Sequence, residues 1–237
     1  MRAGKRLLYR RCHTRFNPLN PVKYALIAVN SSRHNEPCSF PGPAGPIEGL
    51  LDDPDTAPVA VAVVCHPNPV QGGAMQNKVA YMLARAFNDM GAVSLRFNFR
   101  GVGASAGTFD DGAGETLDTL AAMDWLSASH PGLPLWLGGF SFGAYVALRA
   151  QSQRPVQRLV TVAPAVQRFD ASPIVPPVCP WLLVQGDADD VVPAAGVLAW
   201  AKAQPQPPHL AVLAGAGHFF HGRLNELREA VSGAFTL

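Results

Sequence analysis

Short apolar runs alternate along the chain with longer segments in which apolar residues recur at helical spacing. The short runs are rich in β-branched residues, as buried strands are. They are "PVAVAVVC" (58–65), "AVSLRFN" (92–98), "LPLWLGG" (133–139), "RLVTVAP" (158–164), "PWLLVQG" (180–186) and "HLAVLAG" (209–215). The segments predicted to be helices are 76–90, 114–129, 142–152, 193–203 and 223–235. Repeated strand–helix–strand units predict an α/β fold, with a mostly parallel, doubly wound sheet and helices on both faces.

A Pro- and Gly-rich stretch, "CSFPGPAGPIEG" (38–49), precedes this pattern. Its composition is typical of a linker. We therefore place a domain boundary near Pro43, which makes residues 1–42 an N-terminal extension and residues 43–237 one domain. The six residues "IEGLLD", which begin at Ile47, are predicted to be an edge strand.

Charge is distributed unevenly between these two parts. Eight of the 19 Lys and Arg residues lie in residues 1–46, against the single acidic residue Glu36. The rest is mildly acidic, which excludes a nucleic-acid-binding surface on the domain. The basic segment is interpreted as a poorly ordered extension; an arm that contacts membranes or nucleic acid is the alternative. No apolar run approaches the 18 residues that stable membrane insertion requires, and four cysteines without a CxxC spacing favour reduced thiols in a cytoplasmic protein.

The sequence Gly139-Phe140-Ser141-Phe142-Gly143 has the form GxSxG and lies between a predicted strand and a predicted helix. A serine on such a sharp turn is held in a strained conformation that exposes its hydroxyl at the edge of the sheet. The two glycines are needed because a Cβ atom at either position would collide with a neighbouring strand or helix. Ser141 is therefore a candidate nucleophile.

A serine nucleophile requires a base, and the base requires a carboxylate that orients it. His218 follows the last predicted strand, in "LAGAGHFFHGRL", and is preferred over His221 because it lies in the Gly-rich turn. The segment "VQGDADDVVP" follows the strand before it and offers Asp187, Asp189 and Asp190, among which position does not decide. Surface or structural roles are expected for the remaining histidines, which are His13, His34, His66, His130 and His209.

Backbone N–H groups are expected to stabilise the oxyanion of an acyl-transfer intermediate. Phe142, directly after the serine, supplies one. The loop "HPNPVQGG" (66–73) supplies the other at Asn68, because proline has no N–H. The alternative for this loop is an ordinary Pro-rich turn. "RFNFRGVGASAG" (96–107) lacks the third glycine of a dinucleotide-binding loop and is interpreted as a turn beside the active-site cleft.

Five segments of the chain together resemble a family of small bacterial α/β-hydrolases. They are "HPNPVQGGAMQNKV", "LRFNFRGVGAS", "GFSFGAYVAL", "GDADDVVP" and "GAGHFFHGRL". The resemblance covers about residues 43–237, and the chain order Ser, Asp, His is that of this fold. Related proteins carry G-x-x-D-x-x-V-P after the penultimate strand, which implies that Asp189 is the acid. Where they often have "GADH" before the histidine, this chain has Gly217 in place of the acid. The resemblance implies serine-type hydrolysis of esters or thioesters, and such a reaction needs no metal or organic cofactor.

The segment between the strands at 158–164 and 180–186 is too short for a helical cap domain, so we expect an open cleft. Phe140 and Phe219 flank the candidate catalytic residues and are predicted to contact an acyl group. The predicted function is hydrolysis of an ester or thioester of a small or medium acyl substrate through a Ser-His-Asp triad and an acyl-enzyme. The alternatives are an amidase or small-peptide hydrolase with the same triad, and a non-catalytic binding protein on the same fold.

Overall fold

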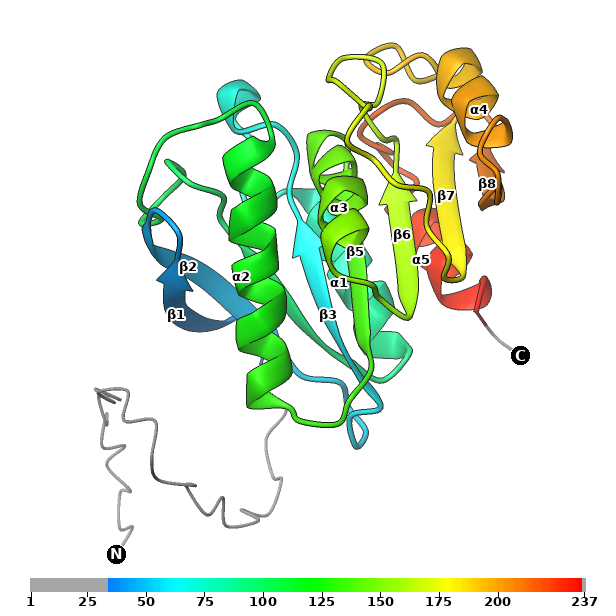
Figure 1. Ribbon diagram of the computed structural model, residues 1–237. Coiled ribbons are helices and arrows are strands. Elements are labelled where there is room, and N and C mark those ends of the chain that lie inside the picture. Colours follow the sequence, from blue (N-terminus) through cyan, green and yellow to red (C-terminus); the bar gives the residue numbers. More distant parts are fainter. Residues whose placement is uncertain (1–33, 236–237) are drawn as a thin grey trace, which may run out of the picture. The chain divides into compact units, whose positions relative to one another are not determined.

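Eight strands form one sheet in the computed structural model, which describes residues 34–235 (Figure 1). Their order across the sheet is β1-β2-β4-β3-β5-β6-β7-β8. Strands β1 and β2 pair antiparallel, as do β2 and β4, and all other neighbours are parallel. The strands are β1 (Glu36–Gly42), β2 (Gly45–Asp52), β3 (Ala60–Cys65), β4 (Ala92–Phe97), β5 (Leu135–Phe140), β6 (Arg158–Val162), β7 (Trp181–Gly186) and β8 (His209–Leu213).

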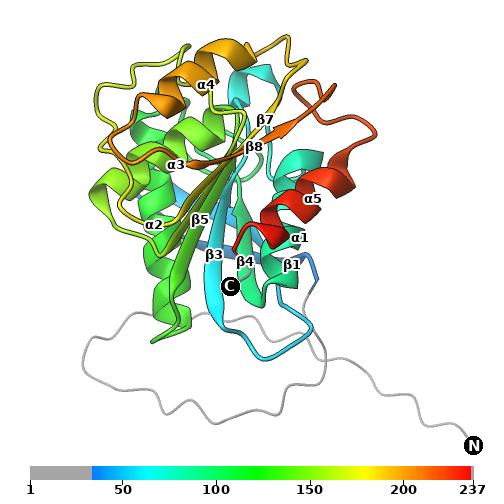
Figure 2. The same ribbon diagram turned by 90° about the vertical axis from the view of Figure 1, so that its right-hand side faces the viewer.

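Helices cover both faces of this sheet (Figures 1 and 2). The helices α1 (Lys78–Asp89) and α5 (Leu224–Gly233) pack on one face, and α2 (Ala113–Ser129), α3 (Phe142–Gln153) and α4 (Ala194–Lys202) pack on the other. A short 3₁₀ turn, η1 (Pro69–Gln71), follows β3. The predicted mostly parallel sheet with helices on both faces is confirmed.

The central strands are apolar along their whole length because both of their faces are covered. Strands β3, β4, β5 and β7 are buried at every residue. Alternate side chains enter two separate cores, so that Leu135 and Leu137 face α2 and α3, whereas Trp136 and Phe140 face α1. This arrangement places the carboxyl ends of β3, β5 and β7 at one edge of the sheet, where open α/β sheets bind ligands.

The predicted linker is instead a β-hairpin. Residues 36–42 form β1, which pairs with β2 through a turn at Pro43 and Ala44, and β1 rather than β2 is the edge strand. Phe40 and Ile47 both enter the core, each 2% exposed. The prediction was wrong because an edge strand tolerates prolines that a central strand does not. The domain therefore begins before Glu36, and residues 1–33 of the predicted extension lie outside the described residues.

No helix interrupts residues 163–180, which connect β6 to β7. A cap domain is therefore absent from this position, as predicted. In residues 34–235, no helix combines the length and the apolarity that crossing a membrane would require.

Candidate active site

Ser141 occupies the sharp turn between β5 and α3. Its backbone has φ 56° and ψ −116°, a conformation that is strained for any residue with a side chain. A Cβ atom at Gly139 would lie 2.2 Å from the carbonyl oxygen of Gly143, and one at Gly143 would lie 2.3 Å from the carbonyl oxygens of Cys65 and His66. Both glycines are thus required by close backbone approach, as the sequence predicts.

Ser141, His218 and Asp189 form one hydrogen-bonded chain. Nε2 of His218 lies 3.1 Å from Oγ of Ser141, and Nδ1 of His218 lies 2.8 Å from Oδ2 of Asp189. All three residues are largely buried, with Ser141 8%, Asp189 7% and His218 4% exposed. Since the carboxylate accepts from Nδ1–H, Nε2 carries a lone pair that faces the serine hydroxyl.

The loops after β7 and β8 approach each other closely enough to make this contact. A Cβ atom at Gly186 would lie 2.2 Å from the carbonyl oxygen of Ala216, so only glycine allows the two loops to pack at this distance. The N–H of Ala188 also donates to the Ala216 carbonyl. His218 follows Ala216 by two residues and is thereby brought beside the segment that carries Asp189.

The other candidates for acid and base lie elsewhere. Asp187 accepts the N–H of Gly215 and so fixes the turn before His218. The side chain of Asp190 is exposed. His221 is also exposed, and its ring packs on Phe219.

Four hydrogen bonds hold the Asp189 carboxylate in its ionised form. Oδ1 accepts the N–H groups of Val191 and Val192 at 2.9 and 2.7 Å, and Oδ2 accepts Nε2 of Gln185 as well as Nδ1 of His218. Burial by itself raises the pKa of Asp189, but the hydrogen bonds from His218 and from the N–H groups of Val191 and Val192 outweigh burial and lower the pKa below its usual range.

The two predicted acyl-contacting phenylalanines differ in position. Phe219 is 44% exposed and faces the site. Phe140 is fully buried, and its ring packs against the His218 ring with the centroids 4.8 Å apart. A side chain without exposed surface cannot contact a substrate, so the prediction for Phe140 was wrong. This residue instead packs against the imidazole ring of His218.

The loop after β3 carries Asn68 beside Ser141. Asn68 caps the η1 turn: its Oδ1 accepts the Val70 N–H, and its carbonyl accepts the N–H groups of Gln71 and Gly73. Its own N–H donates no hydrogen bond within residues 34–235, nor does that of Phe142, the first residue of α3. Both residues line a cavity together with Ser141, so these two donors are available to a ligand.

His66 holds this loop in place from inside the protein. Its Nδ1 lies 2.7 Å from the carbonyl oxygen of Pro67, and its Nε2 accepts the N–H of Phe99 at 3.1 Å. Burial lowers the pKa of His66 to about 4, with the hydrogen bond to Pro67 acting in the opposite direction. His66 is thus neutral, and its structural role agrees with the expectation for the histidines other than His218 and His221.

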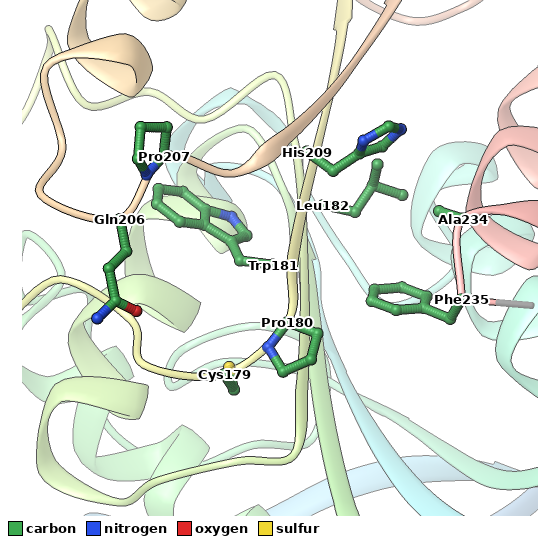
Figure 3. Close-up of a pocket in the computed structure, with 9 residues that line it drawn as sticks. All are labelled: Cys179, Pro180, Trp181, Leu182, Gln206, Pro207, His209, Ala234 and Phe235. Atoms are coloured by element: carbon green, nitrogen blue, oxygen red, sulfur yellow. The ribbon is translucent and has the colours of Figure 1, made fainter. Parts of the chain in front are cut away.

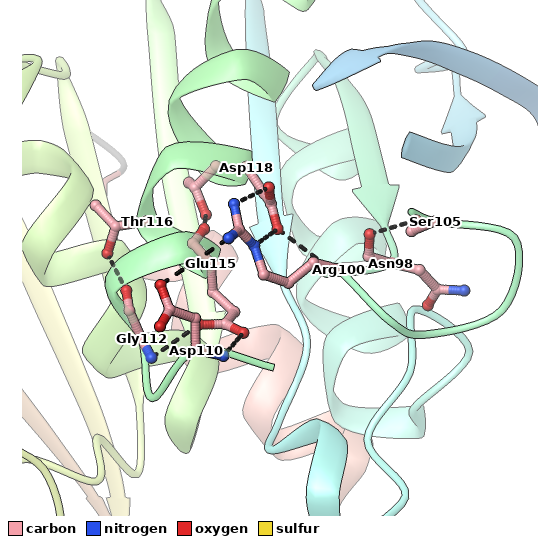
Figure 4. Close-up of polar contacts among 9 residues, drawn as sticks. Asn98, Arg100, Ser105, Asp110, Gly112, Glu115, Thr116 and Asp118 are labelled. Carbon is pink, nitrogen blue, oxygen red and sulfur yellow. Dashed lines mark hydrogen bonds and ion pairs between the residues drawn. The ribbon is translucent and has the colours of Figure 1, made fainter. Parts of the chain in front are cut away.

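The loop that contains Phe99 is braced in turn by the start of α2 (Figure 4). The guanidinium of Arg100 makes two hydrogen bonds to the Asp118 carboxylate, at 2.9 and 3.0 Å, and Glu115 accepts the N–H groups of Asp110 and Gly112. Phe99 also packs edge-on against Phe142, with ring centroids 5.8 Å apart. The loop is a turn beside the site, as predicted, and its polar side chains bind neighbouring segments: Arg100 binds Asp118 of α2, and Asn98 binds Glu48 of β2.

Two small cavities meet at Ser141. One, of about 210 Å³, is lined by Asn68, Gln71, Ser141, Phe142, Ala165, Arg168, Phe169, Val191 and Val192. The other, of about 70 Å³, includes His218 and Phe219 in its lining. A third cavity, of about 300 Å³, lies at the amino ends of β7 and β8, around Trp181 and His209 (Figure 3), at the opposite ends of these strands from His218 and Asp189.

The donor set at Ser141 suits acyl transfer rather than metal binding. Across residues 34–235, no three His, Cys, Asp or Glu side chains are grouped in a way that could hold a metal ion. The sequence indicates a surface or structural role for His66 but not its partner, and it gives no signal for Arg168, which lines the larger cavity. His66 directly follows the apolar strand β3, which indicates burial, but its partner Phe99 is 33 positions away along the chain.

Comparison with known proteins agrees with this architecture. Residues 57–178 match the profile of the hydrolase family described as serine aminopeptidase, S33. An α/β serine hydrolase homologue from Coxiella burnetii has 39% identity and a TM-score of 0.82, covering 87% of this chain and 100% of its own. A lidless α/β serine hydrolase from Xanthomonas campestris has 41% identity and a TM-score of 0.82, covering 88% and 96%. An uncharacterized protein of Rickettsia prowazekii is 36% identical over 81% of this chain and 85% of its own. The chain therefore belongs to this family of α/β serine hydrolases, and it is a hydrolase.

Proposed function

We propose that this protein hydrolyses a carboxylic ester or thioester with a small or medium acyl group, through Ser141, His218 and Asp189 and an acyl-enzyme intermediate. The observation that carries the proposal is the 3.1 Å approach of His218 Nε2 to Ser141 Oγ, with Nδ1 of the same ring on Asp189. Nucleophile, base and orienting carboxylate are then in the arrangement that activates a serine hydroxyl.

In the first step, Ser141 Oγ attacks the substrate carbonyl carbon while His218 Nε2 takes the hydroxyl proton. The carbonyl oxygen becomes an oxyanion, and the N–H groups of Phe142 and Asn68 are positioned to stabilise it. Asp189 stabilises the imidazolium that forms. When the intermediate collapses, the C–O or C–S bond breaks and Nε2 gives its proton to the leaving alcohol or thiol.

In the second step, water attacks the acyl-enzyme carbonyl and His218 takes a proton from it. The bond to Ser141 Oγ then breaks, Nε2 returns the proton to Oγ, and the carboxylic acid leaves. The same two N–H groups serve the second oxyanion. No metal or organic cofactor takes part in this cycle.

The two cavities at Ser141 suit the two halves of the substrate. The leaving group must come within hydrogen-bond reach of His218 Nε2 to receive its proton. We therefore assign it to the cavity of about 70 Å³ that His218 and Phe219 line, next to solvent. The acyl group then occupies the cavity of about 210 Å³ on the other side, which His218 does not line.

A peptidase or amidase is the second candidate, because the matching family is described as a serine aminopeptidase. An aminopeptidase binds a free α-ammonium group, which favours an acidic side chain at the site. The described residues that line the two cavities include no Asp or Glu, and they include the cation Arg168. Repulsion between like charges therefore disfavours an aminopeptidase substrate, whereas an amide without an ammonium group is distinguished from an ester by experiment.

The first experiment is labelling with a fluorophosphonate probe, which reacts with activated serines. We expect wild type and the control variant Ser129→Ala, which removes an exposed hydroxyl on α2, to be labelled, and Ser141→Ala to be unlabelled. A folded wild type that is not labelled would contradict the proposal and favour a non-catalytic binding protein.

A second experiment compares 4-nitrophenyl esters with 4-nitroanilides of the same acyl group, which decides between esterase and amidase. We expect the ester to react faster. Cytoplasmic location and the role of residues 1–33 stay predictions.

A further inference from the structure

The larger cavity at Ser141, of about 210 Å³, has a mostly apolar lining and one positively charged side chain among its described lining residues. Phe142, Ala165, Phe169, Val191 and Val192 form the apolar part of its lining. Tyr145 stacks on Phe169, with ring centroids 5.1 Å apart, and keeps that wall in place. Arg168 is the one charged side chain among the residues described as lining this cavity, and it is exposed to solvent.

Arg168 is held across the mouth of the cavity. Its N–H donates to the carbonyl of Ala165, which closes a turn after β6, and its Nη2 donates to the carbonyl of Val191 at 2.5 Å. The side chain thus reaches from the loop after β6 to the loop after β7. A guanidinium has five N–H donors, and this hydrogen bond to Val191 is the one that it makes to the described residues.

Among the described residues, the four carboxylates of the loops after β6 and β7 form no ion pair with Arg168, and three of them bind other groups. Asp187 accepts the N–H of Gly215, whereas Asp190 is exposed. Asp170 accepts both the N–H and the hydroxyl of Ser172. Both oxygens of Asp189 are used by His218, Gln185, Val191 and Val192. Within residues 34–235, Arg168 forms no ion pair, although five other arginines do. A guanidinium fixed at the mouth of an apolar cavity, without an acidic partner, is suited to bind a planar anion.

We propose that the acyl group of the substrate carries a carboxylate at its far end, which Arg168 binds. The substrate class is then a monoester or monothioester of a short dicarboxylic acid. The cavity of about 210 Å³ has room for a short acyl chain but not for a long one. A glutaryl group, with three methylene groups between its reacting carbonyl and its carboxylate, is therefore the test substrate. The inference rests on the proposed function, because Ser141 must form the acyl-enzyme.

The test compares two 4-nitrophenyl esters of the same shape. Glutarate is the anionic ester, and 5-methylhexanoate is the neutral one, with an isopropyl group in place of the carboxylate. Each is measured with wild type, Arg168→Met, Arg168→Lys and the control Arg154→Met, which removes an arginine beyond the far end of α3. The rate with Ser141→Ala is subtracted, because the glutarate monoester also reacts without enzyme.

We expect the ratio of kcat/KM for glutarate over 5-methylhexanoate to fall about tenfold in Arg168→Met, as loss of one charge-assisted hydrogen bond implies. In Arg168→Lys the ratio should fall less, and in Arg154→Met it should stay at the wild-type value. Salt should raise the KM of wild type for the anionic ester alone.

Two results would overturn the proposal. One is an unchanged ratio in Arg168→Met, including an equal fall of kcat/KM for both esters, which would give Arg168 a structural role only. The other is that Arg168→Met slows a neutral acyl ester with an anionic leaving group instead. If wild type hydrolyses neither ester faster than Ser141→Ala does, the proposed function itself is contradicted. If wild type hydrolyses the neutral ester and the ratio of kcat/KM is unchanged in Arg168→Met, only the assignment of a dicarboxylic acyl group is contradicted.

Discussion

The Nε2 atom of His66 accepts the backbone N–H of Phe99 at 3.1 Å, and this contact joins two loops that flank Ser141. The other ring nitrogen faces the carbonyl of Pro67, directly before Asn68. The neutral ring, with its proton on Nδ1, satisfies both contacts at once. A second proton would place an N–H against the N–H of Phe99. The position of the loop that carries Asn68 therefore depends on a histidine that stays neutral.

This relationship predicts a loss of stability in mild acid. The pKa of His66 is about 4 in the folded protein, because of burial, against 6.5 in the unfolded chain. The unfolded state thus binds more protons, and the contribution of His66 is complete above pH 6.5 and disappears as the pH falls through 4. The difference corresponds to about 3 kcal/mol of the free energy of unfolding.

Urea denaturation at several pH values between 7 and 4 measures this effect. His66→Gln is the comparison, because its amide is neutral at every pH. This variant should be less stable than wild type at pH 7, by about 1 kcal/mol or more for a lost hydrogen bond. Its stability should fall less steeply than that of wild type between pH 6.5 and 4, and parallel curves would contradict the assignment.

Replacing Gly143 by alanine should prevent the turn at Ser141 from forming. The added Cβ atom would lie 2.3 Å from two backbone carbonyl oxygens of β3 and its loop, which cannot move away as a flexible side chain could. We expect destabilisation of about 3 kcal/mol and loss of probe labelling. Gly233→Ala at the end of α5 is the control, since its Cβ atom meets no described atom within 4 Å. Alanine there should change the free energy of unfolding by less than about 0.5 kcal/mol. Normal activity of Gly143→Ala would refute the steric argument.

Two aspartates of α2 offer a matched test of the loop that carries Phe99. Asp118 is 1% exposed and accepts three hydrogen bonds from Arg100, two from the guanidinium and one from the backbone N–H, whereas Asp124 is exposed and pairs with Arg154 at the surface. Asp118→Asn removes the buried carboxylate and leaves Arg100 with the more distant carboxylate of Asp110 at 4.0 Å, which should cost about 2 kcal/mol. Asp124→Asn should cost less than about 1 kcal/mol. Thermal and urea denaturation compare them, and equal costs would show that the Arg100 pair does not brace the loop.

Much of the site could be predicted because its residues follow strands of a parallel sheet. Ser141 and His218 lie where strand periodicity ends and Gly-rich turns begin, and parallel strands bring such turns to one edge. The choice among Asp187, Asp189 and Asp190 could not be made from position. Side chains within one turn point in different directions, and only the packing of Gly186 against Ala216 selects the one that meets His218.

Two errors have identifiable physical causes. The prolines of β1 predict a linker and outweigh the pattern that places Phe40 in the core. The position of Phe140 next to Ser141 in sequence predicts a substrate contact. The alternation along β5 places it with Trp136 on the face that α1 covers, and this signal was present in the sequence. The contact between His66 and Phe99 depends on the pairing of whole strands and has no local signal.

Asp189 and Asp190 differ by one position and should differ by several orders of magnitude in their effect. In Asp189→Asn, the amide NH₂ can face Nδ1 of His218, while the amide oxygen keeps the N–H groups of Val191 and Val192. Nδ1 then becomes the acceptor, the ring proton moves to Nε2, and Nε2 can no longer take the proton of Ser141. We expect kcat to fall about 10⁴-fold, with stability reduced only moderately. Asp190→Asn changes an exposed side chain and should retain wild-type kcat. Steady-state kinetics on one ester decides the matter, because comparable losses in the two variants would mean that His218 does not take its tautomer from Asp189.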